Sequence, residues 1–281
     1  MRIVMDDAGD VPAESIKKHN LKILPVNVMF GTEEFLSGVD ITHETFYEKV
    51  KAVGDHNFPK TSQPTPFQFV EAYESILAEG EKDILTITVS EKLSGTYASA
   101  VAAGKELEGQ GNFYLFDSQG GSAAQGFMAL EAAEMAAAGK DIDTVIARLK
   151  TMRESMVVVF LINSLEYAVK GGRVSALRST MASLLNIKPI MQLENGLIVE
   201  AGKVRTYKKA MNYMVDFVKE RVGDKPVKVA FLHARDVEGM RTLQALARPQ
   251  LNIVEEIEVD LAIAVAINLG PGALGIAVVP E

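Results

Sequence analysis

Short apolar runs alternate with helical stretches over the first half of the chain, and this alternation most limits the folds open to it. Four runs have the length and composition of buried strands: Ile3–Met5, Ile23–Phe30, Ile84–Val89 and Phe113–Phe116. Apolar residues recur at helical spacing between and after them, in Thr42–Val53, Phe67–Leu77, Thr96–Leu107, Ala123–Ala138 and Ile142–Arg153. The alternation predicts an α/β domain with a mainly parallel sheet and helices on both faces.

The second half of the chain has a different pattern. Asn195-Gly196 lies between two apolar runs and predicts a hairpin. The runs that read as strands are Val157–Ile162, Lys188–Leu193, Leu197–Val204, Val227–His233 and Ile253–Val259, and helices are predicted at Ala176–Leu185 and Glu238–Ala247. A hairpin followed by β-α-β predicts a mixed, partly antiparallel sheet with helices. We therefore expect two domains, 1–160 and 161–281, and the space between two domains is the usual place for a ligand.

Composition excludes several classes of function. The formal net charge is −8 over 281 residues, which argues against nucleic acid as the main partner. The chain has no cysteine, so thiolate catalysis and cysteine metal sites are excluded, and its four histidines are far apart, so we expect no metal site. The apolar stretch Leu261–Val279 is interrupted by Asn268 and by Gly270-Pro271-Gly272, so it does not predict a membrane span. With no signal-like segment near Met1, we expect a cytoplasmic protein.

Two short segments combine hydroxyl side chains with a predicted helix start. They are Thr61-Ser62-Gln63-Pro64-Thr65-Pro66 and Ser94-Gly95-Thr96-Tyr97-Ala98-Ser99-Ala100. The N-terminus of a helix attracts anions, because its first N–H groups lack acceptors and its dipole is positive there. The pair of segments therefore predicts a receptacle for a small anion such as a carboxylate or phosphate. Helix capping by Ser and Thr is the alternative for either segment taken alone.

Other residues leave alternatives open. Ser94 could be the nucleophile of an esterase or acyl-transfer enzyme, with His233 as its base, although Lys92–Thr96 does not form a Gly-x-Ser-x-Gly elbow. Arg173 and Arg205 could recognise an acidic partner or a phosphoryl group, or they could be ordinary surface charges. A third alternative is a sensor of a small polar acid.

Taken in order, motifs along the whole chain resemble the DegV family of bacterial fatty-acid-binding proteins. The two hydroxyl-bearing segments are part of the series. The others are Asp6 with Asp10-Val11-Pro12, Asp117-Ser118, Gly171-Gly172-Arg173-Val174-Ser175, Ile187-Lys188-Pro189-Ile190, Lys203-Val204-Arg205, His233-Ala234 and Gly270-Pro271-Gly272-Ala273-Leu274-Gly275. Each motif is modest alone, but the ordered series is specific.

The resemblance implies a binding protein without catalytic residues, metal or cofactor. A long-chain fatty acid would lie in an apolar tunnel between two α/β domains. Family members similar to this chain act as the lipid-binding subunit of a fatty-acid kinase: they present the carboxylate to an ATP-dependent kinase subunit and carry the acyl phosphate toward phospholipid synthesis. Membrane contact would be at most transient. The resemblance places the carboxylate at the residues Thr61, Ser62, Ser94, Gly95, Thr96 and Asn268, and it places kinase docking or phosphoryl contacts at Arg173 and Arg205.

The chain departs from the family pattern at two positions. Asn268 and Leu269 stand where the family usually has His followed by Thr or Val, and asparagine can donate a hydrogen bond but carries no positive charge. Asp6-Asp7 stands where the family usually has Asp-Ser. An inward-pointing Asp7 would disfavour a bound carboxylate by like-charge repulsion.

Overall fold

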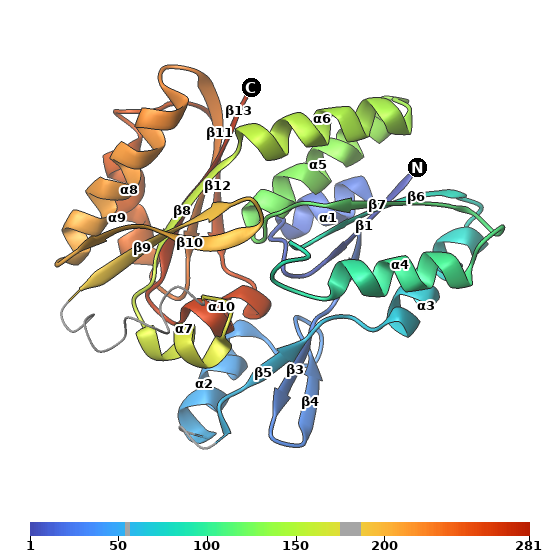
Figure 1. Ribbon diagram of the computed structural model, residues 1–281, viewed down its shortest axis with the longest axis horizontal. Coiled ribbons are helices and arrows are strands. Elements are labelled where there is room, and N and C mark those ends of the chain that lie inside the picture. The colour runs from blue at the N-terminus through green and yellow to red at the C-terminus, as the bar shows by residue number, and fades with distance from the viewer. Residues whose placement is uncertain (54–56, 175–186) are drawn as a thin grey trace. The chain divides into compact units, whose positions relative to one another are not determined.

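The computed structural model describes residues 1–53, 57–174 and 187–281, which form two compact units. The first unit comprises Met1–Arg153 and Ala262–Ala264, and the second comprises Glu154–Leu261 and Val265–Glu281. The segment Ala262–Ala264 is held in the first unit by a hydrogen bond from the N–H of Ala262 to Oδ1 of Asp10 (2.9 Å). Each unit combines strands with helices (Figure 1).

The main sheet of the first unit is entirely parallel. Its strand order is β2-β1-β6-β7. The strands are β1 (Arg2–Asp6), β2 (Lys22–Leu24), β6 (Asp83–Thr88) and β7 (Asn112–Asp117). This arrangement confirms the parallel sheet predicted from the alternating pattern. The carboxyl ends of all four strands lie at one edge, where ligands of such sheets usually bind.

Helices lie on both faces of this sheet (Figure 1). On one face, side chains of α3 and α4 pack with Val4, Leu24 and Ile84 of the strands. On the other face, α5 contacts β1 and β6, and α1 and α6 lie beside α5. The bounds of these helices are α1 (Ala13–His19), α3 (Pro66–Ala78), α4 (Thr96–Glu106), α5 (Ala123–Ala137) and α6 (Ile142–Ser155). The core therefore fills both sides of a sheet whose carboxyl edge carries the loops described below.

A small antiparallel sheet of order β4-β3-β5 branches from the first unit. Its elements are β3 (Asn27–Phe30), β4 (Glu33–Leu36), β5 (Lys60–Ser62) and the adjacent helix α2 (His43–Val53). The prediction of one continuous strand at Ile23–Phe30 was wrong, because β2 and β3 belong to different sheets. Pro25 separates them, since it has no N–H to donate to a ladder.

The second unit contains a six-stranded mixed sheet of order β10-β9-β8-β13-β11-β12. Only β11 and β12 pair in parallel, and the other neighbours are antiparallel. The strands are β8 (Val157–Leu161), β9 (Lys188–Glu194), β10 (Leu197–Val204), β11 (Pro226–His233), β12 (Asn252–Asp260) and β13 (Leu274–Pro280). The predicted mixed sheet is confirmed. β8 pairs with β13 and β9 in this sheet.

The turn between β9 and β10 has the backbone that its residues favour. Asn195 (φ 50°) and Gly196 (φ 79°) both have positive φ. Positive φ at both central residues is typical of a type I′ turn, which matches the twist of the flanking strands. The predicted Asn-Gly hairpin is therefore confirmed.

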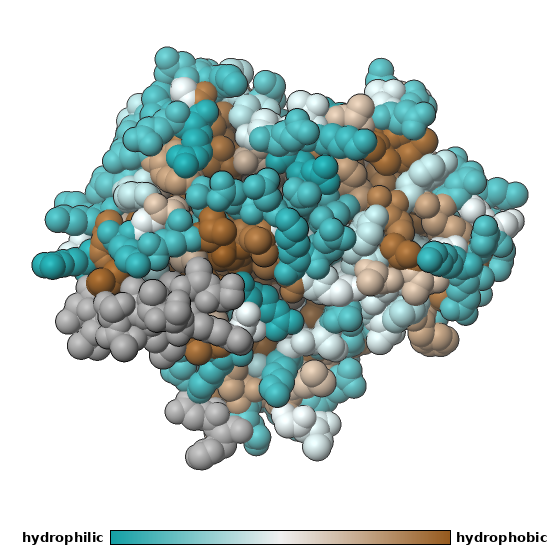
Figure 2. Space-filling view, viewed as in Figure 1, coloured by the Kyte–Doolittle hydropathy of each residue, from teal (hydrophilic) through white to brown (hydrophobic). Residues whose placement is uncertain are grey.

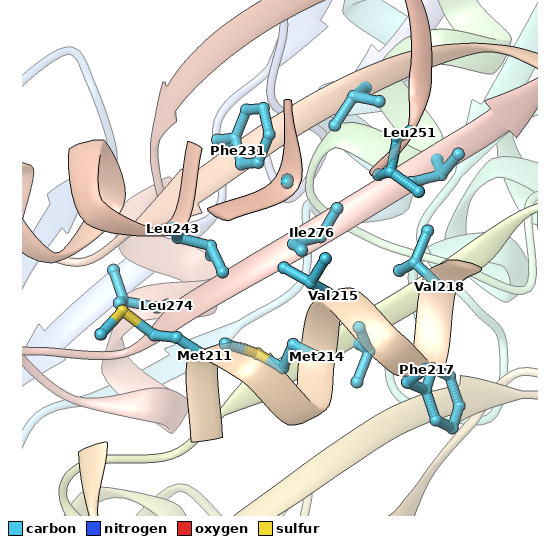
Figure 3. Close-up of a cluster of buried hydrophobic side chains, with 14 of the residues drawn as sticks. Met211, Met214, Val215, Phe217, Val218, Phe231, Leu243, Leu251, Leu274 and Ile276 are labelled. Carbon is cyan, nitrogen blue, oxygen red and sulfur yellow. The ribbon is translucent and has the colours of Figure 1, made fainter. Parts of the chain in front are cut away.

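Helices α8 (Tyr207–Val222) and α9 (Val237–Ala247) cover the core of this unit. Figure 3 shows two of these contacts, with Met211 of α8 beside Leu274 and Val215 of α8 beside Ile276. All of these side chains are at most 5% exposed. Burial of such large apolar side chains, each worth about 1.5–3 kcal/mol, stabilises the unit.

Two further helices of the described residues are short. They are α7 (Leu165–Gly171) and α10 (Ile263–Leu269). The sequence pattern did not predict α1, α7 or α8, and it read the apolar tail as one stretch where the structure has α10 followed by β13. The predicted helix Ala176–Leu185 lies outside the described residues. On the face seen in Figure 2 hydrophilic residues predominate, with smaller hydrophobic areas among them.

Candidate functional site

The first hydroxyl segment leads into a helix, as predicted, but only its last residues lie at the helix start. Thr61 and Ser62 do not lie at a helix start but in β5, opposite Val28 and Asn27 of β3. Helix α3 begins four residues later, where the Thr65 side chain accepts from Gln68 N–H and the Gln68 side chain accepts from Thr65 N–H (2.8 Å). This is a capping box, with Pro66 in the first turn. The capping alternative therefore holds for Thr65, and the hydroxyls of Thr61 and Ser62 are held by a strand.

The second hydroxyl segment begins α4 as predicted, but Ser94 does not cap the helix. The N-cap residue is Gly95, and it has no side chain that could satisfy the first N–H groups. The Ser94 hydroxyl instead contacts the hydroxyl of Thr96 (Oγ to Oγ1, 2.9 Å). Two hydroxyls carry two protons and their mutual contact uses one, so the other can be donated to a ligand. Thr96 is buried and Ser94 partly exposed.

The two segments meet at Gly95. A Cβ added at Gly95 would lie 2.8 Å from Nε2 of Gln63, so the Gln63 side chain packs directly over the start of α4. Gln63 is in turn held by buried Asn27, whose Nδ2 donates to the Gln63 carbonyl (3.3 Å) and to the Ser62 hydroxyl (3.4 Å). The residues of β5 and the N-terminus of α4 thus form one polar surface, and Gln63 is a part of it that the sequence reasoning did not single out.

Asp6, at the end of β1, holds the carboxyl edge of the parallel sheet together. Its carboxylate accepts hydrogen bonds from the N–H of Val89 (2.9 Å), the N–H of Ala8 (3.1 Å) and Nε2 of Gln125 (3.1 Å). Burial raises the pKa of Asp6, and these hydrogen bonds oppose the rise. All three donors come from this chain, so Asp6 acts in the fold rather than as a ligand contact.

Asp7 is fixed at the crossing between the two sheets of the first unit. Its Oδ1 accepts from the N–H of Val26 (2.8 Å), and Ser37 is also hydrogen-bonded to it. Burial, with smaller contributions from the charges of Asp6 and Asp10, raises the pKa of Asp7 to about 7. Near neutral pH a fraction of Asp7 is therefore uncharged.

Asp117 and Ser118 shape the turn after β7. Oδ1 of Asp117 accepts from the N–H groups of Gln119 (2.9 Å) and Glu91 (3.2 Å), and the Ser118 hydroxyl accepts from Gly120 N–H (3.1 Å). These contacts are all made within the first unit.

In the second unit, Gly171 brings two further candidate residues together. Asn268 lies on α10 and is 8% exposed, and its Oδ1 would be 2.4 Å from a Cβ at Gly171. Arg173 is exposed, and its Nη1 donates to the carbonyl of Gly171 (2.9 Å). Gly172 between them ends α7 with φ of 77°. The structure therefore places Asn268 and Arg173 against the same residue, Gly171.

The loop after α10 is anchored by side chains of the same unit. Gly270 and Gly272 have φ of 76° and 79°, which other residues rarely adopt. The Tyr207 hydroxyl donates to the Gly272 carbonyl (2.9 Å) and to Asp236, and burial raises the pKa of Tyr207. Arg205 is exposed and lies between β10 and α8. Among the described residues, no contact joins it to Gly171.

The esterase alternative finds no support around Ser94, whose hydroxyl partner is Thr96 rather than an imidazole or carboxylate. His233, on β11 in the second unit, lies beside Asp260 (Nδ1 to Oδ1, 3.5 Å). Over the ranges that the structure describes, no three His, Asp or Glu side chains are grouped so as to hold a metal ion. Within the same ranges no helix is long and apolar enough to cross a membrane.

Comparisons with known proteins agree with this fold. A family model described as "Uncharacterised protein, DegV family" matches residues 1–281. Protein DegV of Bacillus subtilis is 32% identical over 278 residues, covering 98% of this chain and 97% of the relative. Two similar solved structures each cover all of this chain. One is a fatty-acid-binding DegV family protein from Thermus thermophilus (TM-score 0.92, 29% identity, 100% of that chain), and the other is DegV, a fatty acid binding protein from Bacillus subtilis (TM-score 0.86, 30% identity, 99% of that chain). The chain therefore belongs to the DegV family.

Proposed function

We propose that the chain binds a long-chain fatty acid and holds its carboxylate at the start of α4. The observation that carries the proposal is the Ser94–Thr96 hydroxyl pair beside an N-cap glycine that leaves the first helical N–H groups without a side-chain acceptor. A carboxylate there would accept from a hydroxyl and from helix N–H groups, and it would meet the positive end of the dipole. The fatty-acid binding reported for the two solved relatives supports the same ligand class.

The polar surface of β5 extends the carboxylate site. Thr61 and Ser62 supply further hydroxyls, and Gln63 supplies an amide that lies over Gly95. Asn268, in the second unit, supplies a side-chain amide in place of the family's usual His. The acyl tail would contribute about 0.8 kcal/mol for each buried methylene, so affinity would depend mainly on the tail and orientation on the head group. The apolar tunnel that the resemblance implies for the tail stays a prediction.

The first experiment replaces Ser94 by alanine. Ser94→Ala should lower affinity for oleate and palmitate by about tenfold or more, because it removes a hydrogen bond to a charged group. Isothermal titration calorimetry checks this. Ser75→Ala is the matched control, because Ser75 is exposed on α3 of the same unit. Unchanged affinity of the Ser94 variant would remove Ser94 from the site, whereas hydrolysis of nitrophenyl esters lost only in that variant would favour the esterase alternative.

We further propose that the protein presents the bound carboxylate to an ATP-dependent kinase subunit, and that Arg173 and Arg205 contact that subunit or the phosphoryl group. Both side chains are exposed, as such a role requires. Arginine matches phosphoryl oxygens with a planar set of donors. The acyl phosphate would then be carried toward phospholipid synthesis.

The presenting role is tested by replacing Arg173. Arg173→Ala should leave oleate affinity unchanged and lower the rate of acyl-phosphate formation with a purified fatty-acid kinase subunit by about tenfold, because a charge-assisted contact is lost. Arg241→Ala, which removes an exposed arginine from α9 of the same unit, is the control and should have no effect. If oleate binding collapsed in the Arg173 variant, the docking role would be wrong.

A further inference from the structure

Gly171 occupies a position where no side chain fits. A Cβ there would lie 2.4 Å from Oδ1, 2.9 Å from Cα and 3.0 Å from Cγ of Asn268. Real Cβ atoms essentially never approach other atoms closer than 3.0 Å. The backbone of Gly171 is not in the positive-φ region, so alanine would be strained there only by its contacts. The glycine is therefore required by the approach of α10 to the end of α7.

Helices α7 and α10 cannot readily move apart to relieve such a contact. Further along the same interface, Gly270 packs on Tyr167 of α7, where an added Cβ would lie 2.8 Å from the ring, and Gly272 packs on Asn163, with 2.4 Å to Nδ2. The loop that carries these two glycines is also bound by the Tyr207 hydroxyl through the Gly272 carbonyl. An added methyl group at Gly171 would thus displace the Asn268 side chain and the segment around it rather than separate the helices.

Gly171 also holds the Arg173 side chain by a hydrogen bond. Nη1 of Arg173 donates to the Gly171 carbonyl, while the Asn268 side chain packs against the Gly171 Cα. One residue therefore fixes the positions of both the guanidinium and the amide. We propose that Gly171 is a positioning residue that sets Asn268 for the head group of the ligand and Arg173 for the kinase step. This inference rests on the proposed function, because it assigns Asn268 and Arg173 those two roles.

The test is Gly171→Ala, measured with two ligands of one tail. Affinity for oleate should fall about tenfold, because Asn268 loses its place at the carboxylate, whereas affinity for methyl oleate should not change. Acyl-phosphate formation at saturating oleate should also fall. Damage to the fold or to the tail site would lower affinity for both ligands alike, and that result would overturn the inference.

The matched control is Gly202→Ala in β10. Gly202 also has a backbone that alanine can adopt, and its Cβ would lie 2.6 Å from the Tyr213 ring in the same unit. This substitution should lower thermal stability but should not change the affinity for oleate relative to that for methyl oleate. If Gly202→Ala discriminated between the ligands as strongly as Gly171→Ala, the effect would not belong to Gly171 and the inference would fail.

A double substitution tests the contact itself and covers a failure to fold. Asn268→Ala removes Oδ1 and Cγ, the closest and third-closest contacts, so the loss of thermal stability caused by Gly171→Ala should be smaller in that background. If the single variant does not fold, recovery of folding in the double variant supports the inference, and failure of both overturns it. Wild-type protein that binds neither oleate nor palmitate would instead refute the proposed function.

Discussion

Two adjacent aspartates show how local contacts decide the role of a residue. The carboxyl groups of Asp6 and Asp7 are both buried, and burial raises the pKa of each. Asp6 is enclosed by donors from the turn after β1, from α5 and from the residue after β6, so it fastens the sheet edge. Asp7 contacts Val26, which follows Pro25 at the crossing from the parallel sheet to the small sheet. The additional acid at position 7 therefore has a structural partner.

Asp7 should make stability depend on pH. Because its pKa is about 7 in the folded protein and 3.8 ordinarily, the folded state favours the protonated form. The stabilising contribution is fully present below about pH 4 and is lost as the pH rises toward 7. Asp7→Asn keeps an oxygen that can accept from Val26 N–H and removes the cost of ionisation.

We expect Asp7→Asn to raise the free energy of unfolding at about pH 8 by about 1–3 kcal/mol, and to change it little at about pH 4.5. Urea denaturation at the two pH values measures this. Asp216→Asn, which removes an exposed carboxylate on α8, is the control for net charge. An equal effect of Asp7→Asn at both pH values would show that ionisation of Asp7 is not linked to folding.

At the scale of elements, the sequence predicted those whose pattern is local. The strands β1, β6, β7 and β10 and the helices α3 to α6 follow from apolar periodicity, and the Asn195-Gly196 turn follows from a backbone preference. β5 has the residues Lys-Thr-Ser, which carry no apolar signal, and it exists as a strand because β3 pairs with it. That this segment forms a strand was therefore beyond the reach of local reasoning.

The candidate site divides in the same way. The hydroxyls near α4 and the glycine-rich segments could be found as residue types in suggestive positions. The contacts that give them meaning, Gln63 with Gly95 and Gly171 with Asn268, join segments that are far apart in the sequence. No periodicity or capping rule refers to such pairs, because they depend on how strands and helices pack. The contacts of Gln63, Gly171 and Tyr207 consequently emerged only from the structure.

At the scale of the whole molecule, the proposed roles are distributed over both compact units. The hydroxyls and helix N–H groups proposed for the carboxylate belong to the first unit, and the residues proposed for other contacts, Asn268, Arg173 and Arg205, belong to the second. An acidic chain with a net charge of −8 would thus bind an anion with local dipoles and a few placed donors rather than with its overall field. This division predicts that ligand binding and kinase engagement can be separated by mutation.

Fatty-acid binding itself is the central claim, and native mass spectrometry of the protein purified from bacteria tests it most directly. We expect a population of chains heavier than the polypeptide by the mass of one long-chain fatty acid, because a tail buried at about 0.8 kcal/mol per methylene should survive purification. Solvent extraction followed by lipid analysis would identify the adduct, and Ser94→Ala should show lower occupancy than Ser75→Ala. A spectrum that contains only the mass of the polypeptide, with no acyl chain in the extract, would contradict the account.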